Sequence, residues 1–457
     1  MKPYMLSKRT GSVLFAAIIA ALAITVPAVT AQEVAVDNES GVGARAMGMG
    51  GASIAAVNDL TAVIYNPAAL ARLSNMEVHL GVNILKRDVQ STLKSVAEGN
   101  GTATSLTDYS GIGSFGVAYP VPTERGSLVF ALAYNRIKDF EGRFEVDGYN
   151  DTLAGFETDE SIEEGGLSIM SVAGAMDVSP NVSFGASLDI WMGSYKRNNR
   201  MLLNDYTYDD NPDLSYYSQL DMTGVDDDIT AWSFKPSILY HKKRFRFGAY
   251  LRFPMRFHVK EYNYQEYYVR DDGQYFGLYE MIDPSSEFSD GADDDHMSYT
   301  IKAPIQLGFG LAWNPTGMSM VAFDLIYENW RQGRLDYPSD YFQEPGYFRN
   351  KYRSSLSWRI GYEQRLPFGL IGRVGYLRQP LTFKGPRGYE SDLPSIVVEN
   401  ERDFITFGFG KQFEEALSVD VGFAYGFWSE KEEPRTDEEN RTRIYVSVTY
   451  RAPKLFE

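Results

Sequence analysis

The stretch VSFGASLDIWM, residues 182–192, decides the fold. Its even-numbered positions are apolar or small, from Val182 to Met192, whereas Ser183, Ser187 and Asp189 make the opposite face polar. Alternation with a period of two is the pattern of a β-strand with two unlike faces. A soluble β-sandwich alternates in the same way, so this strand alone does not choose between a sandwich and a membrane barrel.

The same alternation recurs along the chain from Met76 onward. Gly, Ser and charged residues share the polar face in Lys302 to Trp313, in Ser418 to Phe427 and in Arg443 to Arg451, as suits a lumen. We count about fourteen such segments, an even number, as in single-chain bacterial barrels. They begin near Met76, Ser110, Gly126, Gly165, Pro180, Ile229, Arg244, His296, Met318, Tyr352, Leu370, Arg402, Ala416 and Arg441.

The connections between these segments alternate in length. Short connections lie near residues 120–125, 177–181, 241–243, 314–317, 366–369 and 413–415, and long ones span about 86–109, 138–164, 196–228, 260–295, 332–351, 384–401 and 429–440. Outer-membrane barrels have short periplasmic turns and longer extracellular loops. A soluble sandwich has no reason to sort its loops in this way. We therefore predict an all-β fold, a single transmembrane antiparallel β-barrel.

The N-terminus is typical of a secretory signal peptide, which we place at residues 1–31. Positive residues precede an apolar run from Val13 to Val26, and the small residues of Val29-Thr30-Ala31 form the cleavage site. A membrane anchor is the alternative, but the run is short and ends at Pro27. We expect export to the outer membrane of a Gram-negative cell.

Composition excludes several classes of protein. The 457 residues carry a formal charge of −17, and loss of Lys2, Lys8 and Arg9 with the signal would leave about −20, which disfavours nucleic acid as a partner. The chain has no Cys, so it has neither a lipoprotein anchor nor a disulfide framework. No Gly loop ends in Lys-Ser or Lys-Thr, and we predict no cofactor.

Residues 32–75 differ from the rest because Gly and Ala dominate the run GVGARAMGMGGASIA at 41–55. Such residues allow close backbone approach inside a confined space. Asn66 is a predicted N-cap, with Pro67 at the first position of a short helix over Ala68 to Leu73.

This N-terminal run resembles the hatch of the FadL/TodX family of outer-membrane transporters for long-chain fatty acids and aromatic hydrocarbons. The matching positions are Gly43, Arg45, Ala46, Gly51, Ala52, Asp59 and the triplet Asn66, Pro67 and Ala68. Ala303-Pro304-Ile305 with Leu307-Gly308, residues 324–330 and Arg373 to Tyr376 resemble later strands more loosely.

The resemblance implies passive transport of a hydrophobic small molecule through a barrel of fourteen strands at 76–457, with a hatch at 32–75 plugging the lumen. Ligand would be captured from outside and released when the hatch rearranges. In the family a kink in the third strand opens a side exit into the bilayer. Gly126 to Ile137 shows no Pro and no obvious bulge signal.

An arginine ladder is the candidate ligand site. In Arg244 to His258, large apolar residues share one face and Arg246, Arg252 and Arg256 share the other. Arg pairs well with carboxylates, so the ladder could bind a fatty-acid headgroup. The alternative, which we favour, is that these residues pair with lumen acids, for which the candidates are Asp189, Asp324, Glu363 and Asp420.

Two further features are assigned to the membrane surroundings. The acidic runs Asp226 to Asp228 and Asp293 to Asp295 fit solvated outer loops, and neither has the spacing of a calcium loop, so we predict no metal site. Aromatic residues at segment ends could form interfacial girdles in contact with lipid and lipopolysaccharide. They are Trp191, Tyr195, Trp313, Tyr327 and Trp330.

Two rival functions remain open. An outer-membrane enzyme is disfavoured, because nothing places a nucleophile beside His79, His241, His258 or His296. A secretion-associated barrel resembling the PorV family, which binds exported proteins, also has a Gly/Ala run that ends in Asn-Pro-Ala. We expect a monomer without enzymatic activity.

Overall fold

The computed structural model describes residues 32–33, 41–96, 99–150, 155–207, 215–271, 274–278, 297–336, 347–380, 399–400, 402–414, 416–432 and 435–452. The predicted signal peptide at 1–31 and the acidic run at 293–295 lie outside these residues. Within them no helix combines the length and the apolar character needed to cross a bilayer.

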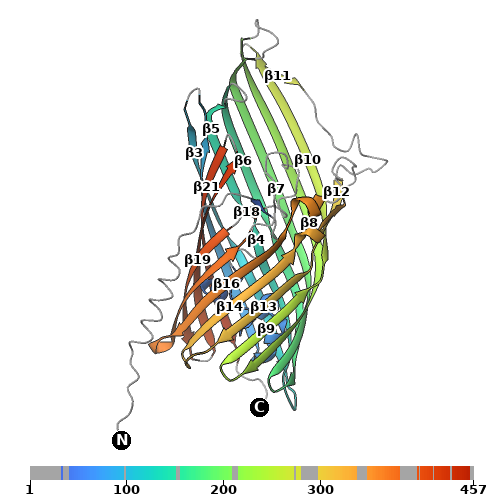
Figure 1. The fold of residues 1–457 in the computed structure, drawn as a ribbon, viewed down its shortest axis with the longest axis vertical. Helices are drawn as coiled ribbons and strands as arrows, with labels where there is room; N and C mark the ends of the chain where they lie inside the picture. Colours follow the sequence, from blue (N-terminus) through green and yellow to red (C-terminus); the bar gives the residue numbers. More distant parts are fainter. Residues whose placement is uncertain are drawn as a thin grey trace. The chain divides into compact units, whose positions relative to one another are not determined.

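The described strands form one closed antiparallel barrel (Figure 1). Its fourteen staves are β2 (Glu77–Leu93), β3 (Gly101–Val121), β4 (Leu128–Asp139), β6 (Gly155–Ser179), β7 (Val182–Thr207), β8 (Ser215–Lys242), β9 (Phe245–Arg252) continued by β10 (Met255–Asp271), β12 (Met297–Ala303) continued by β13 (Gln306–Trp313), β14 (Ser319–Asn329), β16 (Ser354–Arg365), β17 (Leu370–Gln379), β19 (Arg402–Phe413), β20 (Leu417–Glu432) and β21 (Arg435–Arg451). β2 pairs with β21 from Glu77–Arg451 to Leu93–Arg435, which closes the cylinder. In a closed barrel the backbone N–H and C=O groups of every strand form hydrogen bonds with neighbouring strands, as lipid surroundings require. The predicted barrel is confirmed.

Short strands and short helices accompany the barrel strands. β1 (Gln32–Glu33) pairs with β18 (Glu399–Asn400), and β5 (Gly142–Asn150) pairs with β6. The others are β11 (Gln274–Leu278), β15 (Arg334–Asp336), η2 (Trp330–Gln332), α5 (Tyr347–Lys351) and η4 (Pro367–Gly369).

Side chains on the wall face lipid and lumen alternately, as predicted. On β7, Phe184, Leu188 and Ile190 are 47–49% exposed, whereas Ser187 and Asp189 are 1% exposed. The apolar face therefore points outward and the small or polar face points into the lumen.

The short turns gather at one end of the barrel, which we call the short-turn end, where β21 ends at Arg451 (Figure 1). At the opposite, long-connection end the strands continue far beyond the 9–11 residues that cross a bilayer, with 28 residues in β8. The long loops predicted at 86–109 and 196–228 are thus largely strand. On β2 the outward face there is polar, as Lys86, Asp88 and Gln90 show, so the apolar face by which the other strands are recognised is missing.

Two neighbouring strands break at proline. β9 gives way to β10 at Phe253-Pro254, and β12 gives way to β13 at Pro304-Ile305, with Arg252 paired to Gln306 and Met255 to Ala303 across the break. Pro has no N–H to give to a ladder, so sheets accommodate it at irregularities. The inward face changes from even to odd numbers across Pro254, which the sequence alternation did not predict.

The third strand of the barrel, β4, contains a bulge. Its register against β6 shifts between Arg136 and Lys138, and its pairing with β3 ends at Ser114–Asn135. Beyond the bulge, Asp139 accepts hydrogen bonds from Asn83 of β2 at 2.9 Å and from Arg443 of β21 at 2.5 Å. No residue in Gly126 to Ile137 predicts this bulge, because Ile137 is an ordinary strand residue.

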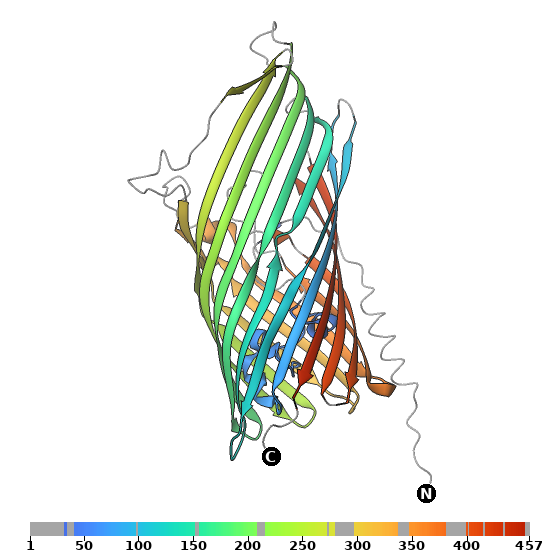
Figure 2. The same cartoon turned by 180° about the vertical axis from the view of Figure 1, so that it is seen from behind.

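The N-terminal segment from Gly41 to Leu73 lies inside the barrel, toward the short-turn end, where Figure 2 shows its short blue helices between the strands. These helices are α2 (Ala44–Gly48), α3 (Ala62–Tyr65) and η1 (Pro67–Arg72). η1 contacts β6, β7 and β8, whereas α2 contacts β19 and β20. We call residues 41–73 the hatch.

Candidate functional site

The hatch touches the wall through glycine and alanine. The wall glycines that face it come from β7, β9, β13, β16, β17, β19 and β20 and are Gly185, Gly248, Gly310, Gly361, Gly375, Gly408 and Gly422. A Cβ on Gly375 would lie 2.2 Å from the Gly50 backbone nitrogen, and one on Gly361 would lie 2.3 Å from the Met49 carbonyl oxygen. Backbone therefore rests directly on backbone, and a side chain at either position would collide.

Alanines complete this contact on the other side of the barrel. The hatch residues Ala68, Leu70 and Leu73 form one buried cluster with small side chains of β3, β4 and β6. These wall residues are Ala118, Ala131, Ala133, Ala173 and Ala175. Small residues on hatch and wall together form what we call the hatch seam.

Two polar side chains anchor hatch backbone. Asp324 of β14 accepts hydrogen bonds from the Ser53 and Ile54 N–H groups at 2.6 and 2.8 Å. The Asn66 side chain caps η1 by accepting from the Ala68 N–H at 3.2 Å, and its amide donates to the Ile54 carbonyl at 2.9 Å. The predicted N-cap with Pro67 at the first helical position is confirmed.

An ion-pair chain links the hatch to three strands. Arg45 Nε donates to Glu363 Oε2 at 2.8 Å, Arg373 Nε donates to the same oxygen at 2.8 Å, and Arg373 Nη1 lies 2.7 Å from Asp420 Oδ1. Burial alone would lower the pKa of Arg45, but the facing Glu363 carboxylate outweighs it and raises that pKa above its ordinary value. Arg45 thus stays charged and holds α2 to β16.

The other family-matched residues shape the hatch from within. Gly43 has φ +84° and Gly51 has φ +73°, values that favour glycine. Asp59 accepts from the Thr61 N–H at 2.9 Å and so closes a local turn. Ala46 and Ala52 are buried in small-residue clusters. None of these side chains faces an open cavity lined by apolar groups.

Above the hatch seam, toward the long-connection end, large apolar side chains line the lumen. We call this set the lumen cluster: Ile137, Phe140, Leu167, Ile169, Trp191, Tyr195, Ile229, Met255, Phe257, Val259, Tyr299, Ile301, Trp330, Phe348 and Tyr352. Ile64 of the hatch packs against it from below. An apolar interior is unusual in a barrel that conducts water and ions, whose lumen is polar.

A small cavity lies where the lumen cluster meets the hatch. Its volume is about 40 Å³, and its apolar lining includes Ile54 and Ile64 of the hatch with Ile169 and Trp191 of the wall. The charged side chains of its lining are engaged. Lys235 Nζ donates to the Ile64 carbonyl at 2.6 Å and lies 3.9 Å from Asp189, Arg252 pairs with Glu328 at 3.1 Å, and Arg359 donates to the Gly51 carbonyl at 3.5 Å. The space therefore suits an uncharged group.

The predicted arginine ladder is not continuous. Arg252 is buried, faces the lumen and lies 5.4 Å above the Trp191 ring, but Arg256 is exposed on the outward face because the strand breaks at Pro254. Arg246 lies at the short-turn end beside the hatch. The acids expected to pair with the ladder have other partners, as Asp324 binds the hatch and Glu363 binds Arg45 and Arg373.

Part of the predicted aromatic girdle lies inside the barrel. Trp191, Tyr195 and Trp330 are at most 2% exposed and belong to the lumen cluster, whereas Trp313 is 41% exposed and faces outward. Trp191 and Tyr195 share the face of Ser187 and Asp189. Their phase along β7 therefore identifies them as lumen aromatics, and the girdle predicted from residue type is wrong for Trp191, Tyr195 and Trp330.

Comparison with known proteins supports the resemblance. A family model described as "Outer membrane protein transport protein (OMPP1/FadL/TodX)" matches residues 19–330. A search of curated proteins gives no match.

Solved structures share the fold. The P. putida toluene transporter TodX superposes with a TM-score of 0.58 at 15% identity, covering 90% of this chain and 99% of that chain. A Pseudomonas aeruginosa FadL homologue gives 0.57 at 14% identity, covering 92% and 100%, and the Ralstonia pickettii toluene transporter TbuX gives 0.52 at 13%, covering 91% and 100%. Since the family model covers more than half of the sequence and the fold agrees, this chain belongs to the OMPP1/FadL/TodX family of outer-membrane transport proteins.

Proposed function

We propose that the protein passively transports hydrophobic small molecules, aromatic hydrocarbons or long acyl chains, across the outer membrane. The observation that carries the proposal is the lumen cluster, an apolar lining inside a barrel whose short-turn end is filled by a hatch. Two of the structures with the same fold are named as toluene transporters. Apolar surface is where such ligands gain free energy on leaving water.

The size of the cavity indicates how a ligand binds. At about 40 Å³ it is far below the roughly 300–1,000 Å³ of typical ligand pockets. Side chains of the lumen cluster must therefore move when a ligand enters. Because Lys235 and Arg252 already have partners, we expect an uncharged aromatic to be preferred over a carboxylate.

The matched residues of the hatch and the path of exit are part of the proposal. Gly43, Arg45, Ala46, Gly51, Ala52, Asp59, Asn66, Pro67 and Ala68 would keep the plug folded and docked rather than bind ligand. A side exit of the kind that the resemblance implies would open at the β4 bulge, where β3 and β4 part above Ser114–Asn135.

We propose further that residues 1–31 are removed on export, that residues 32–75 and 76–457 act as hatch and barrel, and that the protein works as a monomer embedded in lipid and lipopolysaccharide without enzymatic activity. The family match does not favour the PorV-like alternative, because the matched family is a family of outer-membrane transport proteins.

The histidine contacts bear on the rival enzymatic function. His79, one of the described histidines, contacts the hydroxyl groups of Thr449 and Ser114 at 2.9 Å each, in the half of the lumen that the hatch occupies.

Native mass spectrometry of the mature barrel tests the transport proposal. We expect toluene or laurate to remain bound as a discrete adduct. Ile169→Asp should abolish the adduct, because it places a carboxylate in the apolar cavity, whereas Ile169→Leu at the same position should retain it. Absence of an adduct with both ligands on the unaltered barrel, or an undiminished adduct on Ile169→Asp, would contradict the proposal.

A further inference from the structure

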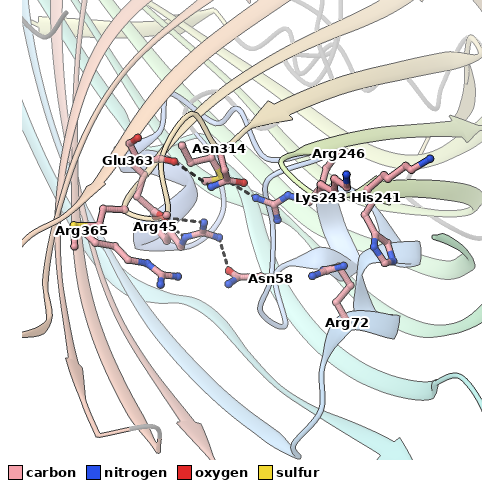
Figure 3. A pocket seen from close by; sticks show the side chains of 14 residues that line it. Arg45, Asn58, Arg72, His241, Lys243, Arg246, Asn314, Glu363 and Arg365 are labelled. Carbon is pink, nitrogen blue, oxygen red and sulfur yellow. Dashed lines mark hydrogen bonds and ion pairs between the residues drawn. The ribbon is translucent and has the colours of Figure 1, made fainter. Parts of the chain in front are cut away.

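A second cavity lies at the other end of the hatch and is basic rather than apolar. It has a volume of about 270 Å³ and opens toward the short-turn end, between the hatch, the β8–β9 turn and the β13–β14 turn. Figure 3 shows cationic side chains from both the hatch and the wall around it, with Arg45, Arg72 and Arg246 bordering the central space. They are Arg45, Arg72, Lys242, Lys243, Arg246 and Arg365, with His241 beside them.

The cavity holds more positive than negative charge. Glu363 is its one carboxylate within the lining, and that group is already shared by Arg45 and by Arg373 behind it. In the part of the chain that the structure describes, no carboxylate lies within ion-pair distance of Arg72, Lys243 or Arg246. This local excess is opposite in sign to the chain's formal charge of −17.

Arg246 shows the deficit most clearly. It is partly buried, yet Nη1 reaches only the Ala56 carbonyl at 3.4 Å and Nη2 only the Met320 sulfur at 2.7 Å. A guanidinium is a fork of donors suited to two oxygens of one anion, and a thioether is a weak acceptor. The described residues therefore do not supply Arg246 with an oxyanion, which is the strongest acceptor for a guanidinium.

We propose that this cavity is a binding site for a small oxyanion, phosphate or carboxylate, that enters from the periplasm. The anion would bridge Arg246 and Lys243 of the wall to Arg72 and Arg45 of the hatch, as charge-assisted hydrogen bonds to several cations permit. Because the bridge spans both bodies, the bound anion stabilises the docked hatch. The proposal concerns the end of the lumen opposite the lumen cluster and stands whichever hydrophobic ligand the protein carries.

Isothermal titration of the purified full barrel in neutral detergent with inorganic phosphate tests the site. At constant ionic strength set with chloride, we expect saturable binding to one site. Arg246→Gln should weaken that binding by about tenfold or more, the loss of one charged hydrogen-bond partner. The matched control is Arg244→Gln, since Arg244 is exposed in the same turn, donates to the Pro315 carbonyl at 3.1 Å and does not line the cavity.

Two further arms distinguish the source of the anion. Acetate binding in place of phosphate would identify a carboxylate, and stronger binding of a short-chain phosphatidic acid than of free phosphate would identify a lipid headgroup. In planar bilayers, phosphate added on the short-turn side should reduce the frequency of hatch openings in the unaltered protein but not in Arg246→Gln. Oxyanion binding no tighter than that of chloride, or equal affinity in Arg246→Gln and Arg244→Gln, would overturn the proposal.

Discussion

The two halves of the lumen are built from different side chains, although the same strands form both. Along β7, the short-turn half presents Gly185 to the hatch, and six residues later the strand presents Trp191 to the lumen cluster. Where the hatch docks, the wall has glycine, so that the backbones of hatch and wall are in direct contact. Where a ligand is to pass, the wall supplies large apolar surface instead.

This difference separates two tasks, docking the hatch closely and admitting a ligand, that one residue type could not perform together. Close contact over glycine makes a plug that fits in one position only, because interiors are close-packed and any added atom is felt. The lumen cluster makes no such backbone contact with the hatch, and we expect its side chains to change rotamer, because a cavity of about 40 Å³ is too small to accept a ligand otherwise. We therefore expect the hatch seam to limit ion leakage and the lumen cluster to govern which ligands pass.

Deleting Gly41 to Leu73 should have the largest effect. The barrel keeps its strand ladder and closure, so we expect it to fold, while the short-turn half of the lumen is emptied. Ion conductance in planar bilayers should rise to that of an open pore. Unchanged conductance of a folded, detergent-stable deletion would show that the hatch does not seal the lumen.

Gly375→Val breaks the seam without removing the hatch. The new Cβ would lie 2.2 Å from the Gly50 nitrogen and 2.3 Å from the Met49 carbonyl carbon, both of them backbone atoms that cannot turn away. We expect persistent leak currents below those of the deletion. Gly174→Ala is the control, since its Cβ would meet the Phe130 ring at 3.4 Å and the Val129 carbonyl oxygen at 3.9 Å, which are ordinary contacts. Equal currents in the two variants would contradict a close seam.

Asp324→Ala should have a smaller and graded effect. The substitution leaves the Ser53 and Ile54 N–H groups without their acceptor, at about 1–3 kcal/mol for each buried group. Since each 1.4 kcal/mol is about a factor of ten in an equilibrium, the undocked hatch should become at least about tenfold more populated. The checks are single-channel open probability and hatch cleavage by added protease. Asp324→Asn keeps an acceptor oxygen, so it should lie between the alanine variant and the unaltered protein.

How much the sequence could predict follows from the range over which each pattern acts. Alternation within one strand is local, and it correctly predicted the lipid-facing side of β7 and the fourteen-strand barrel. It failed at Pro254, where the break moves the inward face from even to odd positions. Phe253 and Met255 continue the apolar alternation across the break, so the sequence pattern does not reveal the change. It also failed at the long-connection end, where the outward face becomes polar, as at Lys86 and Gln90 of β2, and no longer contrasts with the inward face.

The site was predicted unevenly for the same reason. Residues 41–73 stood out because a Gly/Ala run is visible in any one sequence, and Asn66 has a purely local role as N-cap. The sequence indicates the wall glycines only as small lumen residues, since their contact with the hatch joins positions more than 100 residues apart, and more than 300 apart for Gly50 and Gly375. The basic cavity is assembled from four separate segments, so no window along the chain contains its excess of charge.

The smallest effect on leakage should come from the lumen cluster, which is what makes Phe257→Ala informative. Phe257 is fully buried, packs edge-on to Trp191 at a centroid distance of 5.7 Å and lies in β10, away from the hatch seam. Its removal enlarges the apolar space, so we expect larger aromatics to enter proteoliposomes faster while ion conductance stays at the level of the unaltered protein. Phe309→Ala removes the same side chain from the lipid-facing surface, where it is 54% exposed, and should alter neither property. If Phe257→Ala leaked ions as Gly375→Val is expected to, the two halves of the lumen would not be separate devices, because sealing would then depend on the packing of the whole bore rather than on backbone contact at the seam.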